Sequence, residues 1–166
     1  SKKNVFISNG ILYNHESHLR TENFVSRKIS MGVSRMKYGL QNRIPIGNID
    51  SKRDWGFAGD YVKAMHLMLQ ISTAEDFIIS TGVEHSVRDF LNQALKSAKL
   101  ELSAESAIEI NTDLMRPVDS RNLIGDFSKA FKLLGWSPSI NFNNLVNTMV
   151  NYDIQLIKNS MDTNKL

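Results

Sequence analysis

The stretch GNIDSKRDWGFAGDYVKAMHLMLQISTAEDFIISTG, residues 47–82, decides the fold of this chain. Its middle carries apolar residues at helical spacing from Tyr61 to Leu69, which predicts a helix. Residues 77–81 form an apolar run that ends at Gly82 and predicts a buried strand. The charged residues 50–55 are expected to form a loop before the helix. Helix and strand therefore alternate, which is typical of an α/β protein.

The same alternation continues upstream. Residues 5–13 mix β-branched and aromatic side chains, and predict a strand buried on both faces. Residues 14–22 are polar and predict a loop. Apolar positions recur at helical spacing over residues 24–36, which predicts a helix that stops near Gly39. Residues 44–48 then predict a short edge strand, limited by its proline.

Downstream, a cap-like pattern opens the next predicted helix. Ser86 can cap it, with Asp89 in the position where a capping box prefers Glu or Gln. The helix is expected to run to about Lys99. Residues 107–115 are weaker and predict a strand.

Two further helices complete the pattern. Asp126 can cap the first, which Gly135 would close. Asn141 or Asn143 precedes the last, which runs through Ile154 into an end expected to fray. The predicted strands are too few for a complete doubly wound domain.

Composition narrows the class of protein. The chain has 166 residues, no cysteine and a formal net charge of +3. This length suits one domain, and the lack of cysteine excludes disulfides and thiolate metal sites. Basic residues are spread along the chain, so we expect no nucleic-acid surface. The first residues hold no signal core or membrane span, so we expect a soluble, unprocessed, cytoplasmic protein with no membrane partner.

Local motifs of several enzyme classes do not occur in this sequence. It contains no GxGxxG, no phosphate loop of the GxxxxGK type, no HExxH and no GxSxG. The four histidines lack ligand spacing with carboxylates on a common helical face, so we expect no metal site. A whole enzyme is therefore hard to find here, and we assign no catalytic residue.

The polar run Asn14-His15-Glu16-Ser17 directly follows the first predicted strand. In open α/β sheets, ligands bind beyond the carboxyl ends of the strands, which favours a ligand-binding loop. A polar turn whose side chains satisfy backbone groups is the commoner outcome on spacing alone.

Two cationic side chains are candidates for binding an anion. Lys28 lies three residues after Val25, so both can face the same side of the predicted helix, although most such lysines are solvated. Arg53 could form paired hydrogen bonds to a phosphate while Trp55 packs its loop. The alternative for Arg53 is a surface ion pair with Asp54.

The segment Arg116-Pro117-Val118-Asp119 offers a cation, a stiff turn and a carboxylate close together. These groups could hold a phosphate and accept hydrogen bonds from a ribose, or form an ordinary turn. Taken one by one, such candidates argue only for an anion-binding α/β domain.

The order of these segments carries a family resemblance. The runs GILYNHES, FVSRKIS, GNIDSKRDWGFAGDYVKAMHLMLQ, STGVEHSVRDF and RPVDSRNLIGDFSKAFKLLGWSP closely resemble successive segments of GDP-mannose 4,6-dehydratases. These enzymes belong to the extended short-chain dehydrogenase/reductase family. NHES and KRDWG are more specific than the NVYGP-type loop of their sugar-epimerase relatives.

The resemblance implies that residues 1–166 are the carboxy-terminal, substrate-binding part of such an enzyme. Residues 1–22 would supply a late strand of the Rossmann sheet and a cofactor and substrate loop, and the rest a small mixed α/β domain. It implies contacts to the GDP-sugar from Asn14, Val25, Lys28, Arg53, Arg116 and Asp119. At Asp119 the family usually has Glu, which contacts the ribose.

The resemblance also implies cofactor contacts from His15, Glu16 and Arg20. Arg20 matches a position that binds the NADP phosphate, in tetrameric members from a neighbouring subunit.

The resemblance also implies an activity, a lyase step of GDP-fucose biosynthesis that converts GDP-mannose to GDP-4-keto-6-deoxymannose with NADP. The family's glycine-rich cofactor turn, Tyr-x-x-x-Lys pair, and catalytic Thr and Glu have no match in this chain. We therefore expect a separate NADP-binding Rossmann half, a lone chain that is inactive, and a homo-oligomer, dimer or tetramer, when intact. The alternatives are a non-catalytic nucleotide-sugar-binding module and a fragment of a related GDP-sugar reductase or epimerase.

Overall fold

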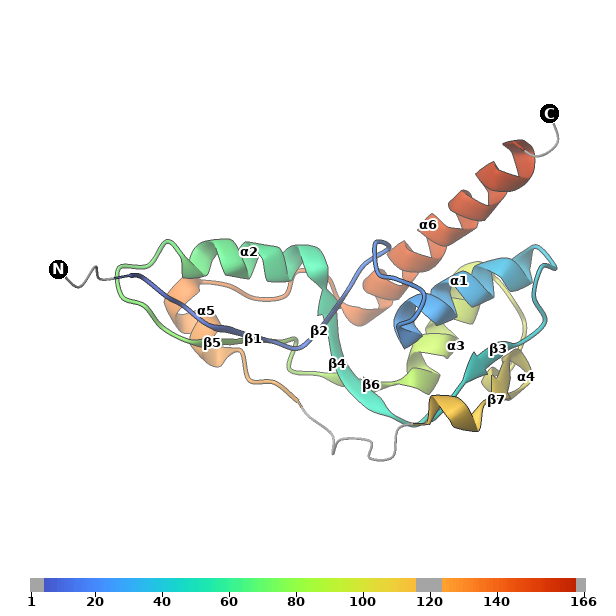
Figure 1. Ribbon diagram of the computed structural model, residues 1–166, viewed down its shortest axis with the longest axis horizontal. Helices are drawn as coiled ribbons and strands as arrows, with labels where there is room; N and C mark the ends of the chain where they lie inside the picture. The colour runs from blue at the N-terminus through green and yellow to red at the C-terminus, as the bar shows by residue number, and fades with distance from the viewer. Residues whose placement is uncertain (1–4, 116–123, 164–166) are drawn as a thin grey trace.

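The computed structural model describes residues 5–115 and 124–163 of the chain. The molecule is elongated, with two hydrophobic clusters on either side of a small central sheet (Figure 1). No helix among the described residues is long and apolar enough to cross a membrane. The α/β class expected from the sequence is confirmed.

The smaller cluster lies at the end that holds the chain's amino terminus (Figure 1). There β1 (Gly10–Leu12) pairs in parallel with β5 (Phe77–Ile79). Helices α2 (Ala58–Met68) and α5 (Ser128–Leu134) pack against β5 and against each other. The core between them is built around Tyr61 and its apolar neighbours.

The central sheet has three strands in the order β2, β4, β6. These are β2 (Asn14–Glu16), β4 (Lys52–Phe57) and β6 (Glu84–Ser86). Strand β2 runs parallel to β4, whereas β6 is antiparallel to it. The register places Asn14 opposite Trp55, so these two side chains share one face of the sheet.

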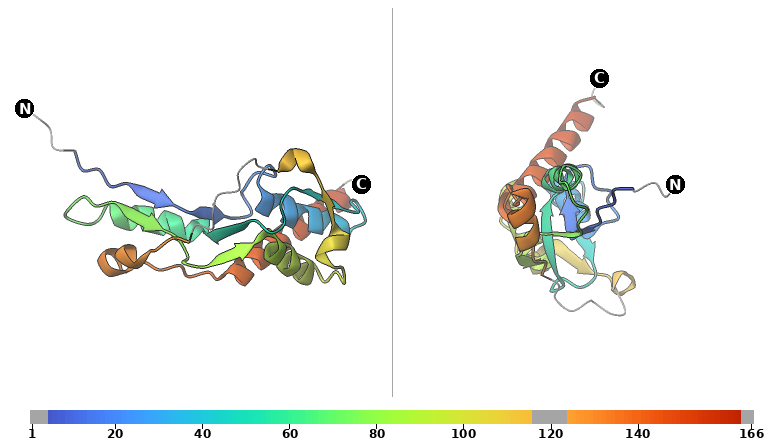
Figure 2. Two further views of the ribbon diagram at one scale, coloured as in Figure 1. Left: turned by 90° about the horizontal axis from the view of Figure 1, so that it is seen from below. Right: turned by 90° about the vertical axis from the view of Figure 1, so that its left-hand side faces the viewer.

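The larger cluster is mainly helical. Its helices are α1 (Val25–Lys37), α3 (Val87–Ala98) and α6 (Phe142–Thr163), which all contact one another. A parallel pair of short strands packs beside them, formed by β3 (Ile44–Ile46) and β7 (Ile108–Ile110). Two short turns of helix flank β7, namely α4 (Ala104–Ala107) and a 3₁₀ turn (Thr112–Leu114). In the right-hand view of Figure 2, α6 projects beyond the other helices of this cluster.

Several local predictions are confirmed. Ser86 and Asp89 form a reciprocal capping box at the start of α3. Gly135 ends α5 in the left-handed conformation, with φ of 64°. Of the two asparagines proposed to cap α6, Asn141 accepts the N–H of Asn144 at 2.9 Å.

The first predicted strand is shorter and less buried than expected. Only Gly10–Leu12 is a strand, and Ile11 is 57% exposed. Side chains alternate along a strand, so Leu12 reaches the small cluster while Ile11 points to the opposite face. The prediction of burial on both faces was wrong, because no described element covers that second face.

The two predicted loops, residues 14–22 and 50–55, are shorter than expected, because part of each is a strand. Asn14–Glu16 and Lys52–Phe57 are strands β2 and β4, which pair with each other. The charged residue in the middle of β4 is tolerated because Asp54 is buried against backbone donors. It accepts the N–H groups of Thr81 and Gly82 at 2.8 and 2.9 Å. In addition, α6 continues to Thr163 rather than fraying after Ile154, because Ile157 is still buried.

Candidate functional site

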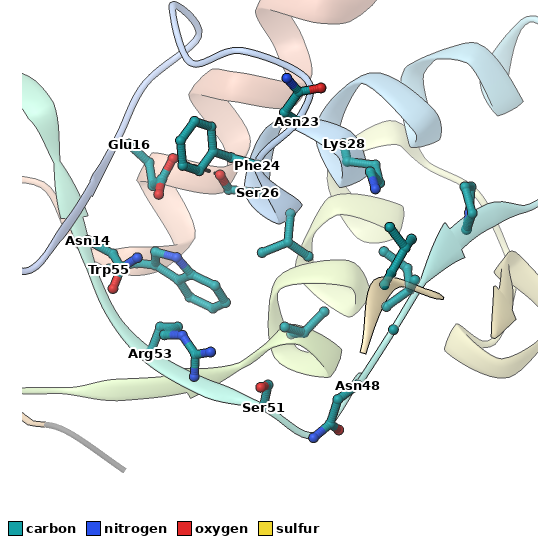
Figure 3. A pocket seen from close by; sticks show the side chains of 16 residues that line it. Asn14, Glu16, Asn23, Phe24, Ser26, Lys28, Asn48, Ser51, Arg53 and Trp55 are labelled. Atoms are coloured by element: carbon teal, nitrogen blue, oxygen red, sulfur yellow. Dashed lines mark hydrogen bonds between the residues drawn. The ribbon is translucent and has the colours of Figure 1, made fainter. Parts of the chain in front are cut away.

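The central sheet and the start of α1 enclose a cavity of about 280 Å³. We call it the α1–β4 pocket, with walls formed by β2, β4, the first turn of α1 and the loop after β3. Figure 3 shows its side chains converging from these elements. Four residues predicted to bind the GDP-sugar line it, namely Asn14, Val25, Lys28 and Arg53.

One wall comes from neighbouring strands. Asn14 on β2 and Trp55 on β4 are opposite each other in the register, and Arg53 lies two residues before Trp55 on the same face. Arg53 is half-buried, and its Nη1 donates to the backbone oxygen of Lys52 at 2.6 Å. The proposed Arg53–Asp54 surface pair is therefore not the arrangement found, because strand alternation turns the Asp54 carboxylate into the interior.

The opposite wall is the first turn of α1. Val25 and Lys28 both line the pocket, which confirms that they face the same side of the helix. Lys28 is half-buried rather than fully solvated. The preceding residue, Phe24, makes no side-chain hydrogen bond that would cap the helix. Backbone N–H groups at an uncapped helix start attract anions, so this wall adds to the positive character that Lys28 gives the pocket.

Glu16 is a buried carboxylate in the wall of this positive pocket. It is 2% exposed, and Ser26 Oγ donates to its Oε2 at 2.7 Å. Arg20 Nε lies 3.3 Å from the same oxygen. Burial raises the pKa of Glu16 above its usual range, although Ser26 and Arg20 act in the other direction. The sequence placed Glu16 among cofactor contacts, and the structure places it between Arg20 and the pocket.

His15 and Arg20 lie outside the pocket lining. His15 projects from the other face of β2, and its ring centroid lies 5.2 Å from that of Tyr61. The guanidinium of Arg20 stacks over the ring of Phe24 at 3.5 Å. The polar-turn alternative applies to Ser17, whose Oγ accepts the N–H of Leu19.

The other two predicted contacts, Arg116 and Asp119, lie outside the described residues. Leu114, just before them, lines the pocket. Gly125, just after them, donates its N–H to Asp54 Oδ2 at 3.3 Å.

Sequence reasoning missed several lining residues. Phe24, Asn48 and Ser51 line the pocket, but within the segments that carry the resemblance they were not singled out as ligand contacts. For Asn48 and Ser51 the signal is spatial, because the bend between β3 and β4 places them at the edge of the pocket across from the start of α1 (Figure 3). Among the described residues, no group of three or more His, Cys, Asp or Glu side chains could hold a metal ion.

The sequence of this chain is similar to those of known proteins of one family. The sequence profile of GDP-mannose 4,6 dehydratase matches residues 1–149. GDP-mannose 4,6 dehydratase 1 of Arabidopsis thaliana is 46% identical over 93% of this chain, and the human GDP-mannose 4,6 dehydratase is 42% identical over 93%. The chain covers 42% and 46% of these two proteins, so it spans less than half their length.

Solved structures share the fold of this chain. The structure of RMD from Pseudomonas aeruginosa complexed with NADPH has a TM-score of 0.79 at 24% identity, over 89% of this chain and 48% of that one. The dTDP-glucose 4,6-dehydratase of Bacillus anthracis in complex with NAD has a TM-score of 0.73 at 18% identity, over 90% and 45%. The fold and the sequence match together show that this chain belongs to the GDP-mannose 4,6-dehydratase family.

Proposed function

We propose that this chain is the nucleotide-sugar-binding part of a GDP-mannose 4,6-dehydratase. With an NADP-binding Rossmann half, it would take part in converting GDP-mannose to GDP-4-keto-6-deoxymannose. The observation that carries the proposal is the meeting of Lys28, Arg53 and the uncapped start of α1 around one pocket. These groups suit a diphosphate.

The physical case rests on charge and geometry. The guanidinium of an arginine can make two parallel hydrogen bonds to phosphate oxygens, and an ammonium adds a point charge. Lys28 and Arg53 approach the pocket from opposite walls, so a diphosphate between them would be held on both sides (Figure 3). Asn14 adds an amide beside Arg53 that can donate to a sugar hydroxyl. We further propose that Arg116 and Asp119 contact the phosphate and the ribose.

The cofactor would lie on the other side of β2. His15 projects from the face of β2 opposite to Asn14, toward α2, which would separate nicotinamide contacts from sugar contacts. Arg20, which lies beside Glu16, carries the positive charge that an NADP phosphate needs, and we propose that in an oligomer it binds the cofactor of a neighbouring subunit. Structural relatives described with NADPH and with NAD are consistent with a nicotinamide cofactor.

The second half of the enzyme would cover apolar surface that this chain leaves open. Val62 and Met65 on α2 and the C-cap residue Leu69 recur at helical spacing and are 60%, 39% and 62% exposed. Grouped exposed apolar side chains mark interaction surfaces. The relatives are more than twice as long as this chain, so they contain a further part of comparable size.

Binding and turnover test the proposal separately. Isothermal titration of the chain with GDP-mannose and with UDP-glucose should give tighter binding of GDP-mannose. Equal affinity would favour a related nucleotide-sugar enzyme. Turnover of GDP-mannose with NADP should be absent for the chain alone and appear when the amino-terminal half of a family member is added. Turnover by the chain alone, or none in the reconstituted pair, would contradict the proposal, and binding without reconstituted turnover would favour a non-catalytic binding module.

A further inference from the structure

Glu16 occupies a junction between two parts of the molecule. It is the last residue of β2, and Ser26, which donates to it at 2.7 Å, lies in the first turn of α1. The connecting loop of residues 17–24 leaves β2 and returns to α1 between these two points. Figure 3 shows the Glu16 carboxylate and Ser26 next to each other at the edge of the pocket. One carboxylate therefore ties the end of the strand to the start of the helix.

The same carboxylate also holds the loop. Arg20, in the middle of the loop, lies 3.3 Å from Glu16 Oε2 and stacks over Phe24. Phe24 lines the α1–β4 pocket, so the contacts run from the loop through Arg20 to the pocket wall. The loop's second ion pair, between Glu22 and Arg35, is exposed on both sides, with 48% and 40% of the side chains accessible.

We infer that Glu16 is a positioning residue that fixes α1 against β2 and couples the Arg20 loop to the pocket. It sets the separation between Asn14 on the strand and Lys28 on the helix, which face the same ligand from two sides. The identity of that ligand rests on the proposed function, but the mechanical link does not.

The two contacts of Glu16 can be tested separately, because Ser26 is a neutral hydrogen-bond donor and Arg20 is a cation. In Glu16→Gln, the amide oxygen can still accept from Ser26, but the attraction to Arg20 is lost. Burial already disfavours the charged form of Glu16, so the neutral variant should fold. Glu22→Gln is the matched control, since it makes the same chemical change in the exposed pair of the same loop.

The experiment combines hydrogen exchange with GDP binding. In Glu16→Gln, the amides of residues 17–28 should exchange about tenfold faster than in the wild type, and the Kd for GDP should rise by about three- to tenfold. Glu22→Gln should leave both quantities within about twofold of wild type, as expected for an exposed pair. Ser26→Ala should raise the Kd with a smaller effect on residues 17–24.

Each outcome decides the inference. Unchanged exchange in Glu16→Gln, or equal changes in both Gln variants, would overturn it. Faster exchange with unaltered GDP affinity would overturn the positioning role, because the pocket wall would then be independent of the loop. If wild type binds no GDP, the proposed function fails, and the difference in exchange between the two variants still decides whether Glu16 forms the link.

Discussion

At the scale of single residues, the buried carboxylate of Asp60 ties α2 to the segment that precedes α6. It is 1% exposed and accepts the N–H groups of Ser139 and Ile140 at 2.8 and 3.1 Å, together with the hydroxyl of Ser139. Asp60→Asn places an amide donor against these donors. We expect it to lower the free energy of unfolding by about 2–4 kcal/mol, measured by urea denaturation at pH 7.

The pH dependence and a control follow from the same contacts. Burial opposes ionisation of Asp60, but the bonds from Ser139 and Ile140 outweigh it and lower its pKa. The stabilising contribution is therefore present above the unfolded pKa of about 4 and is lost as pH falls through the folded value. The difference between wild type and Asp60→Asn should shrink below about pH 4. Lys63→Ala removes only the exposed partner of Asp60 at 3.5 Å and should cost under about 1 kcal/mol.

Arg53 is the second case at this scale, because its planar group is expected to bind phosphate through paired hydrogen bonds. Arg53→Lys keeps the charge and loses the fork, so affinity for GDP should fall by about tenfold or more in a calorimetric titration. Lys129→Ala removes a cation from α5, where it pairs with Glu75, and should leave affinity unchanged. Equal losses in the two variants would mean that the effect is general electrostatics rather than recognition.

At the scale of elements, α1 and α6 are joined by a buried ion pair. Arg27 Nη1 lies 2.7 Å from Asp153 Oδ1, and both residues are almost fully buried. Ser30 donates to Asp153 Oδ2 at 2.7 Å. Asp153→Ala leaves the Arg27 charge buried without its partner, so we expect a loss of about 3–5 kcal/mol in the free energy of unfolding, measured by chemical denaturation.

Removing both charges tests that explanation. The double variant Arg27→Met with Asp153→Leu should be more stable than Asp153→Ala, because no buried charge remains. Ser30 keeps a partner in this variant, the backbone oxygen of Arg27. A double variant as unstable as the single one would show that the helices depend on the ion pair itself rather than on avoiding an unpaired charge.

At the scale of the whole molecule, the open apolar face of α2 predicts self-association of the isolated chain. Val62, Met65 and Leu69 are spaced along one side of α2 and are 60%, 39% and 62% exposed. The double variant Val62→Glu with Leu69→Lys should lower the sedimentation coefficient of the chain at high concentration and block reconstitution with the amino-terminal half. Leu102→Lys alters an exposed apolar residue elsewhere and should change neither.

Predictability from the sequence follows the range of the interactions. The capping box at Ser86 and the glycine end of α5 depend on neighbours within a few residues, so local patterns revealed them. Strand β4 was missed because its pairing partners are distant in sequence. Its register with β2 pairs Trp55 with Asn14, 41 residues earlier in the chain. Without that partner in view, the charged residues of this segment predict a loop.

The sequence by itself determined the α/β class, most helices, the family, and the candidates Asn14, Lys28 and Arg53, since these depend on periodicity and on motifs in a fixed order. Only the tertiary structure decided which candidates share a pocket. It placed Asn14 and Arg53 opposite Lys28 and put His15 on the other face of β2. It also placed Glu16 between Arg20 and Ser26. The physical reason is that strand alternation and the packing of α1 against the sheet fix directions in space, which no local pattern contains.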